Sequence, residues 1–124
     1  KSDQVIEATV AALSKQQDPR AIPALRHAAN GPYDDFLKFS IARAQLALGD
    51  PEGFGTLIRI LKDDEAAYAR QQAHELLEAR SGQKFGYEPE RTVAQNATAL
   101  KHIEEWYSRK GSRLNWDAKT GKFH

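Results

Sequence analysis

Hydrophobic residues recur at helical spacing along most of this 124-residue chain. The clearest run extends from Phe54 to Leu61, where apolar residues keep the i, i+3, i+4, i+7 spacing of a single helix face. Asp, Pro and Gly residues interrupt the pattern and divide it into pieces of helical length. The pattern predicts helices over about residues 3–15, 19–29, 34–48, 51–62 and 65–80.

The last third of the chain has a different pattern. Residues 83–89 combine aromatic residues with Gly and Pro, which predicts an extended connection. A further helix is predicted over about residues 90–109. The tail, residues 112–124, has two short apolar stretches on either side of an Asp-x-x-Thr-Gly sequence, which favours an extended segment or a short β-hairpin.

Large aromatic residues gather in this last third, among them Phe85, Trp106 and Trp116. Each large aromatic ring covers much apolar surface, and the end of a stack of helices exposes an apolar face that needs a cover. We therefore expect residues 1–82 to form helical repeats and residues 83–124 to form a C-terminal cap.

Composition supports an all-α fold, because 19 Ala residues favour helix and β-branched residues are few. The chain contains no Cys, which excludes disulfides, zinc fingers and thiol nucleophiles. No apolar run reaches about 18 residues, so we expect no membrane span. The lack of Cys is compatible with a cytoplasmic protein and with a periplasmic or exported one. Because no initiating Met is present, we expect a part of a larger chain or a processed protein.

The positions of the Asp-Pro pairs and of the Gly residues that end helices indicate an internal repeat. Asp-Pro occurs at residues 18–19 and 50–51, 32 residues apart, and each occurrence opens a short helix, an Asp-rich turn, a longer helix and a Gly stop. In this register Leu25 aligns with Leu57 and Ile41 with Ala73. Periods of 20–50 residues are typical of stacked helix pairs. With residues 3–15 as half of an earlier unit, about two and a half helix pairs are predicted.

The repeat resembles the HEAT family. Residues 18–25 (DPRAIPAL) resemble the first helix of a HEAT repeat, Leu37-Lys38 and Ala69-Arg70 resemble the opening of its second helix, and residues 48–51 (LGDP) resemble the exit into the next unit. Residues 83–124 are similar to a capping segment of bacterial HEAT-like arrays. Gln45 departs from the pattern, which favours Leu there, and the period is short for the family. A tetratricopeptide array is the alternative, but the Trp, Gly and Tyr positions of its first helix are not matched.

The resemblance implies an α-α superhelix whose second helices form a concave surface that binds protein segments. Lys38 and Arg70 are then expected to pair with acidic turn residues, as is common in the family, rather than to bind a ligand. We predict a protein–protein interaction or scaffolding module with a protein partner. The candidate residues for the binding face are Phe36, Phe39, Arg43, Tyr68, Gln71, Gln72, His74 and Glu75.

No catalytic constellation is recognisable, so we expect no enzyme, cofactor or metal. His74 and Glu78 occupy the positions of the two His residues in a zinc-protease helix, but Glu replaces the second His and no third ligand follows. We predict a solvated helix face there. Adjacent carboxylates such as Asp34 and Asp35 point about 100° apart on a helix and cannot flank a substrate. The enzymatic alternative is an accessory domain of the kind found in HEAT-like bilin lyases, which requires a cleft with converging polar groups.

The net charge of +1 is unevenly distributed, because residues 108–124 carry five Lys or Arg residues and a single acidic residue. Together with Trp116 and Phe123 this tail offers a second alternative, nucleic-acid binding. We prefer a tail whose aromatic residues pack on the last helix while its basic residues keep the end soluble, because sustained binding of a polyanion needs a broader basic surface.

Overall fold

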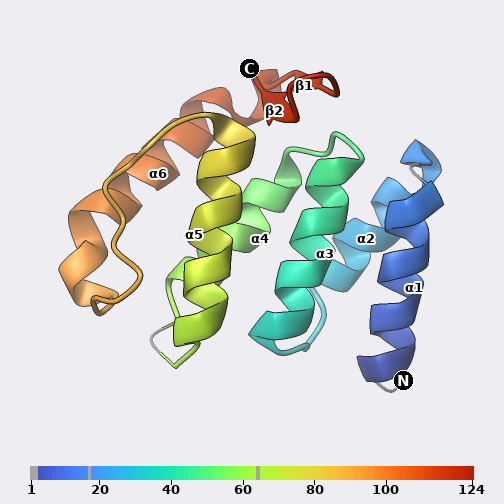
Figure 1. The fold of residues 1–124 in the computed structure, drawn as a ribbon, viewed down its shortest axis with the longest axis horizontal. Helices are drawn as coiled ribbons and strands as arrows, with labels where there is room; N and C mark the ends of the chain where they lie inside the picture. Colours follow the sequence, from blue (N-terminus) through green and yellow to red (C-terminus); the bar gives the residue numbers. More distant parts are fainter. Residues whose placement is uncertain (1–2, 17, 64) are drawn as a thin grey trace.

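The computed structural model describes residues 3–16, 18–63 and 65–124 and shows an all-α fold with a small C-terminal hairpin (Figure 1). The predicted α-helices are confirmed, with boundaries within a few residues for the first five. The described helices are α1 (Asp3–Gln16), α2 (Ile22–Ala29), α3 (Asp35–Ala47), α4 (Glu52–Leu61), α5 (Ala67–Ser81) and α6 (Ala97–Lys110). Short 3₁₀ turns are η1 (Pro19–Ala21), η2 (Ala94–Asn96) and η3 (Gly111–Arg113).

The helices form two layers. In Figure 1, α1, α3 and α5 stand side by side and run in the same direction, while α2 and α4 lie behind them. α3 packs against all four of the other helices in these layers, and α6 packs against α4. The predicted hairpin is confirmed: β1 (Trp116–Asp117) pairs antiparallel with β2 (Lys122–Phe123), and Gly121 takes the positive φ of +69° that closes the turn.

α3 is shared between two apolar clusters. Leu37 and Ile41 on one side of the helix belong to a cluster with residues of α1 and α2, whereas Ala42 and Leu46 belong to a larger cluster with α4, α5 and the cap. Gly53 allows close approach on the second side, because an added Cβ would lie 2.9 Å from the Ala42 carbonyl oxygen. α3 therefore joins the two clusters, because it buries residues in each of them.

Positions aligned by the 32-residue period have matching burial. Leu25 and Leu57 are both buried in the back layer, and Ile41 and Ala73 are both buried in the front layer. Gln45, the departure from the family pattern, is also buried, and its side-chain Oε1 accepts a hydrogen bond of 3.0 Å from the Thr56 hydroxyl in α4. The helix therefore stays regular because the polar side chain has a partner.

Aromatic rings from residues 83–124 pack against α4 and against one another. The Phe54 ring of α4 meets the Trp106 ring edge-on at 5.1 Å and the Phe123 ring at 5.2 Å. Trp116 packs at 4.8 Å from Phe123, so the aromatic rings of the tail are packed against the protein. Phe123 packs on Phe54 of α4, and Trp116 lies against Phe123 and the Arg80 guanidinium of α5, whereas the sequence analysis placed both tail rings on the last helix.

The predicted start of the last helix, at about residue 90, is wrong. The chain turns at residues 89–92, and helical structure begins at Ala94. Thr92 and Gln95 form a capping box, in which the Thr92 Oγ1 accepts from the Gln95 N–H at 3.1 Å and the Gln95 Oε1 accepts from the Thr92 N–H at 3.0 Å. The sequence Thr-x-x-Gln was the signal for this later start.

Candidate interaction surface

Two large aromatic side chains are exposed near the starts of α3 and α5. Phe36 is the second residue of α3 and is 55% exposed, and Tyr68 is the second residue of α5 and is 64% exposed. They are 32 residues apart, which is the repeat period. α3 and α5 pack against each other and run in the same direction in Figure 1, so the N-terminal ends that carry these two residues lie at the same edge of the front layer.

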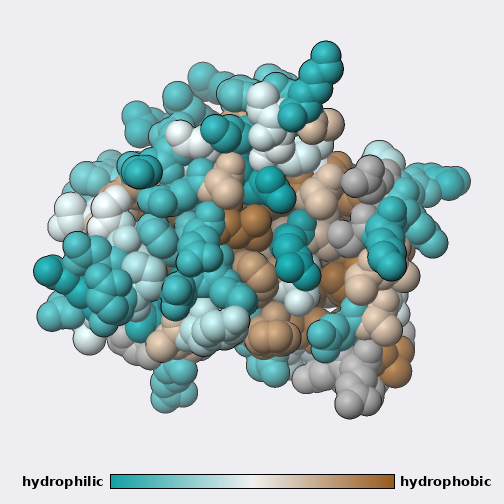
Figure 2. Space-filling model, viewed as in Figure 1, coloured by the Kyte–Doolittle hydropathy of each residue, from teal (hydrophilic) through white to brown (hydrophobic). Residues whose placement is uncertain are grey.

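Other candidate residues continue along the same two helices. The Arg43 guanidinium lies over the Phe39 ring, with 5.7 Å from its carbon to the ring centroid, which is cation–π geometry. The Gln72 Nε2 donates a hydrogen bond of 2.9 Å to the Tyr68 hydroxyl and fixes that ring on the helix surface. Figure 2, which views this face, shows apolar side chains gathered between α5 and α3 with hydrophilic side chains around them.

A pocket of about 520 Å³ lies beside α5. Tyr68, Gln71, His74 and Glu75 line it together with Ala67, Pro89 and Glu90. The sequence reasoning missed Pro89 and Glu90, because it assigned this stretch to the start of the last helix. The structure places them against α5 because the Asn96 side chain binds the Glu88 N–H and C=O at 2.8 and 2.9 Å and so folds the connection back.

The prediction of a solvated helix face at His74 is wrong. Only 16% of the His74 side chain is exposed, because the connection between α5 and α6 lies over it and the Tyr87 ring packs 5.6 Å from the imidazole. His74 Nε2 lies 3.6 Å from a Glu78 carboxylate oxygen, and its Nδ1 is buried without a partner among the described residues. Across the described part of the chain, no group of three His, Cys, Asp or Glu residues could hold a metal ion.

The structure does not bring all eight candidate residues into one pocket. Arg43 lines a separate hollow of about 270 Å³ between α1 and α3, with Glu7, Val10, Ala11 and Ser40. Phe36, Phe39 and Gln72 line neither hollow. The eight residues therefore form a surface along α3 and α5 with a pocket at the side of α5.

A pair of carboxyl groups joins the turns beneath this surface. Burial and a hydrogen bond to Asp63 raise the pKa of Asp35, at the start of α3, to about 6. Conversely, the hydrogen bond from Asp35 holds the pKa of Asp63 below its usual range, with smaller contributions from Arg70 and Lys38. The predicted pairing of Arg70 with an acidic turn residue is wrong, because its Nη1 donates to the Arg91 carbonyl oxygen at 2.7 Å and to the Tyr87 hydroxyl at 3.3 Å.

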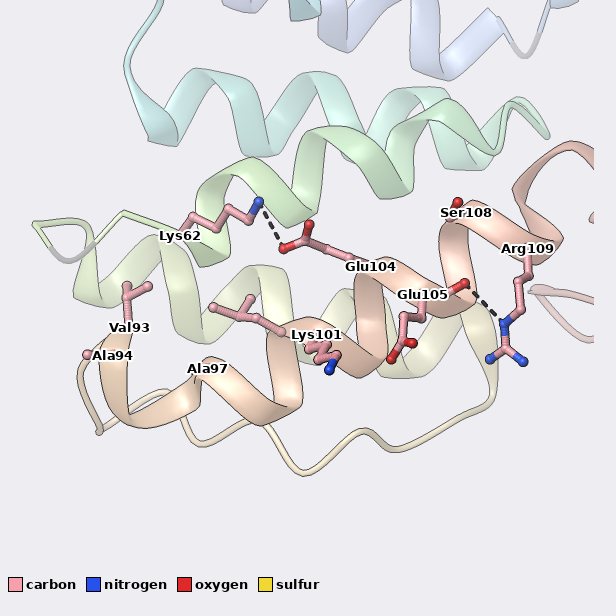
Figure 3. Close-up of a pocket in the computed structure, with 10 residues that line it drawn as sticks. Lys62, Val93, Ala94, Ala97, Lys101, Glu104, Glu105, Ser108 and Arg109 are labelled. Carbon is pink, nitrogen blue, oxygen red and sulfur yellow. Dashed lines mark hydrogen bonds and ion pairs between the residues drawn. The ribbon is translucent and has the colours of Figure 1, made fainter.

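A further hollow, of about 940 Å³, follows α6 (Figure 3). Its apolar floor includes Val93, Ala97 and Leu100. Two of the charged groups around it have partners in its lining. The Lys62 ammonium is 2.9 Å from a Glu104 carboxylate oxygen, and the Arg109 Nε donates a hydrogen bond to the Glu105 carbonyl oxygen.

Comparison with protein families, with curated proteins and with solved structures gives no match for this chain. Within residues 3–16, 18–63 and 65–124, none of the helices has the length and apolar character needed to cross a membrane. The geometry of α3, α5 and the pocket beside α5 is therefore the basis for a functional assignment.

Proposed function

We propose that this chain is a HEAT-like helical repeat module that binds a segment of another protein along α3 and α5. The observation that carries the proposal is the exposure of Phe36 and Tyr68 at equivalent positions of the two repeats. Exposed aromatic rings are typical anchors of protein interfaces, because each gains much buried area when a partner covers it. Two of them in the same register form one continuous surface rather than two scattered contacts.

Charge supports a basic partner segment. Glu75 and Glu90 line the pocket beside Tyr68, and none of the residues lining this pocket is Lys or Arg. A Lys or Arg side chain of the partner would place its charge between these carboxylates and its aliphatic part over the Tyr68 ring. Such complementarity fixes the register of a partner and speeds its association.

Spacing supports a short helical partner segment. Packed helices lie about 8–10 Å apart, and from this spacing we expect a similar separation between Phe36 and Tyr68, which occupy matching positions of α3 and α5. Residues i and i+7 of a helix are separated by about 10 Å, which matches this spacing. The proposed partner segment therefore carries apolar residues about two helical turns apart and a basic residue beside the second one.

Selection of peptides from a displayed random library tests the proposal without knowledge of the natural partner. Peptides of about 16 residues selected on the wild-type chain are expected to combine apolar residues with Lys or Arg. Phe36→Ala combined with Tyr68→Ala should lower their affinity at least tenfold, since hot-spot aromatic residues carry much of an interface's binding energy. Glu75→Gln combined with Glu90→Gln should weaken binding most at low salt.

His27→Ala is the matched control, because His27 is an exposed ring on α2 in the opposite layer. This variant should bind the selected peptides as tightly as the wild type. Circular dichroism should show the same helix content for all variants. Selected peptides that bind the Phe36 and Tyr68 variant normally, or a selection that yields no binding peptide, would contradict the proposed surface.

A further inference from the structure

We propose that a hollow at the C-terminal ends of α5 and α6 binds the phosphate group of a small phosphorylated ligand. The hollow has a volume of about 360 Å³ and lies between these helix ends and the C-terminal hairpin. Ser81 contributes to it from α5, Trp106 and Lys110 from α6, and Lys122 from β2. It is separate from the surface formed by α3 and α5, and the proposal is independent of the protein-binding role.

The charge of the hollow is positive. Lys110 and Lys122 line it, and none of its lining residues is Asp or Glu. His124 also lines it, and its Nε2 lies 3.8 Å from an Asp117 carboxylate oxygen. Neither lysine ammonium is in an ion pair with a carboxylate of the described residues, in contrast to Lys62, which binds Glu104. Two unpaired ammonium groups on different elements are a match for a dianion rather than for a single carboxylate.

A buried donor without a partner points to a ligand or water with acceptor oxygens. Trp106 is 3% exposed, and its indole Nε1 has no hydrogen-bond partner among the described residues. The indole N–H is a donor only, and a buried donor left unpaired is rare in folded proteins because it costs the desolvation of the group. The rings of Phe54 and Phe85, at 5.1 and 5.5 Å, hold the indole in place.

The Ser81 hydroxyl adds a further donor. Its Oγ accepts a hydrogen bond of 3.2 Å from the Gln83 N–H, and in the described structure its own hydrogen is given to no acceptor. The lining of the hollow therefore includes two lysines, the Ser81 hydroxyl and the buried indole of Trp106, and it includes no Asp or Glu residue. Phosphate oxygens accept hydrogen bonds from all of these groups.

The packing of the tail favours a single phosphate group over a nucleic-acid strand. Single-stranded nucleic acids stack their bases on exposed aromatic rings. Phe123 is buried against Phe54, and Trp116 packs between Phe123 and Arg80, whose guanidinium carbon is 6.0 Å from the Trp116 ring. These rings are therefore not free to receive a row of bases.

The indole N–H signals in a proton–nitrogen correlation spectrum report on the hollow directly. The chain contains two Trp residues, so Trp106 and Trp116 give two indole signals, and the signal that disappears in Trp106→Phe identifies the first. Inorganic phosphate, titrated at constant pH and ionic strength, should shift the Trp106 signal saturably with a Kd on the order of 1 mM, as is reasonable for so small a ligand. The Trp116 signal should change less.

Three variants separate binding from structure. Lys110→Gln combined with Lys122→Gln should weaken the saturable shift at least tenfold, and Ser81→Ala should weaken it severalfold, both without change in the melting temperature. Lys119→Gln, an exposed lysine of the same tail that does not line the hollow, should bind phosphate normally. A shift that grows linearly without saturation, or one that is equal in the double-lysine variant, would overturn the proposal.

Other anions distinguish the possible ligand classes. Sulfate, a dianion of similar size, should compete with phosphate, and acetate should not. A phosphate monoester such as phenyl phosphate should bind at least as tightly as phosphate itself. If acetate binds equally well, the site is a carboxylate site. If an eight-residue single-stranded thymidine oligonucleotide binds more tightly than the monoester, the tail is a nucleic-acid surface. Either result would overturn the assignment to a phosphorylated small molecule.

Discussion

The Asp50 carboxylate, which has no exposed surface, accepts two hydrogen bonds of 3.0 Å from the Arg26 guanidinium. Arg26 belongs to α2, whereas Asp50 lies two residues before the first residue of α4 and accepts the Glu52 N–H at 3.1 Å. One carboxylate therefore starts α4 and ties the two helices of the back layer together. The same contact raises the pKa of Arg26, because its charged form is the hydrogen-bond donor.

Replacement of Arg26 by Met should destabilise the chain by about 3 kcal/mol, because a buried charge that loses its partner remains buried and uncompensated. Urea denaturation followed by circular dichroism measures this loss. Arg59→Met is the control, since Arg59 is exposed and donates to neutral oxygen atoms of Asn30 and Thr56. Its expected cost is below about 1 kcal/mol. Equal losses in the two variants would mean that the buried ion pair has no special role.

The carboxyl pair of Asp35 and Asp63 predicts a pH dependence of stability. Since burial raises the pKa of Asp35 to about 6, the folded chain holds a proton on Asp35 that the unfolded chain releases near pH 4. Folded chains then bind more protons than unfolded ones between about pH 4 and 6, so Asp35 lowers the free energy of unfolding as the pH rises through this interval. Above pH 6 the penalty is constant.

Asp35→Asn should remove this penalty, because the amide stays neutral and still donates a hydrogen bond to the Asp63 carboxylate. The stability of the variant relative to wild type should increase from pH 4 to pH 6 and then level off, with a gain of about 1 kcal/mol. Urea midpoints at half-unit pH steps measure the difference. A difference that is constant from pH 4 to 7 would show that Asp35 does not hold the proton.

The buried hydrogen bond between Gln45 and Thr56 predicts a non-additive pair of substitutions. Gln45→Leu alone should destabilise the chain by about 1 kcal/mol, because the cost of a buried Thr56 hydroxyl without its acceptor exceeds the gain from the added apolar side chain. Addition of Thr56→Val should restore most of the loss, because both polar groups are then absent. A double-mutant cycle from chemical denaturation checks the coupling. Additive effects would contradict it.

The hydrogen bonds of Asn96 are expected to hold the connection between α5 and α6, which forms one wall of the pocket beside α5. The Asn96 side chain is buried and donates to the carbonyl oxygens of Glu88 and Thr92 at 2.9 and 3.0 Å. Asn96→Ala should cost about 2 kcal/mol, because several backbone groups of the connection lose their partner. Amide hydrogen exchange at residues 87–92 should become faster in this variant, while exchange in α4 changes only by the global loss of stability. Unchanged exchange at 87–92 would show that other contacts hold the connection.

The helices themselves were predictable, because their signals are local. The Asp34 side chain accepts the Leu37 N–H at 2.9 Å, as expected for an acidic residue at a helix start. The apolar positions from Phe54 to Leu61 are buried, since their spacing allows one helix face to meet the core. The hairpin was predictable for the same reason, as a turn sequence between two short apolar stretches.

The surface was predictable only in part. The sequence named Phe36 and Tyr68 among eight candidates, but the helical phase that exposes them depends on which side of α3 and α5 meets the core. Pro89 and Glu90 could not be placed beside Tyr68, because the contact crosses about 20 residues of chain and depends on Asn96. His74 was misjudged for the same reason.

The sequence by itself determined the helical pieces, their start signals and the 32-residue period, because each depends on residues within a few positions of one another. Tertiary structure decided the partners of the polar groups inside: Arg26 for Asp50, Thr56 for Gln45, and none within the described structure for the Trp106 indole nitrogen. The physical reason is that the free energy of a buried polar group depends on atoms brought to it from other helices, and these are fixed only when the helices pack.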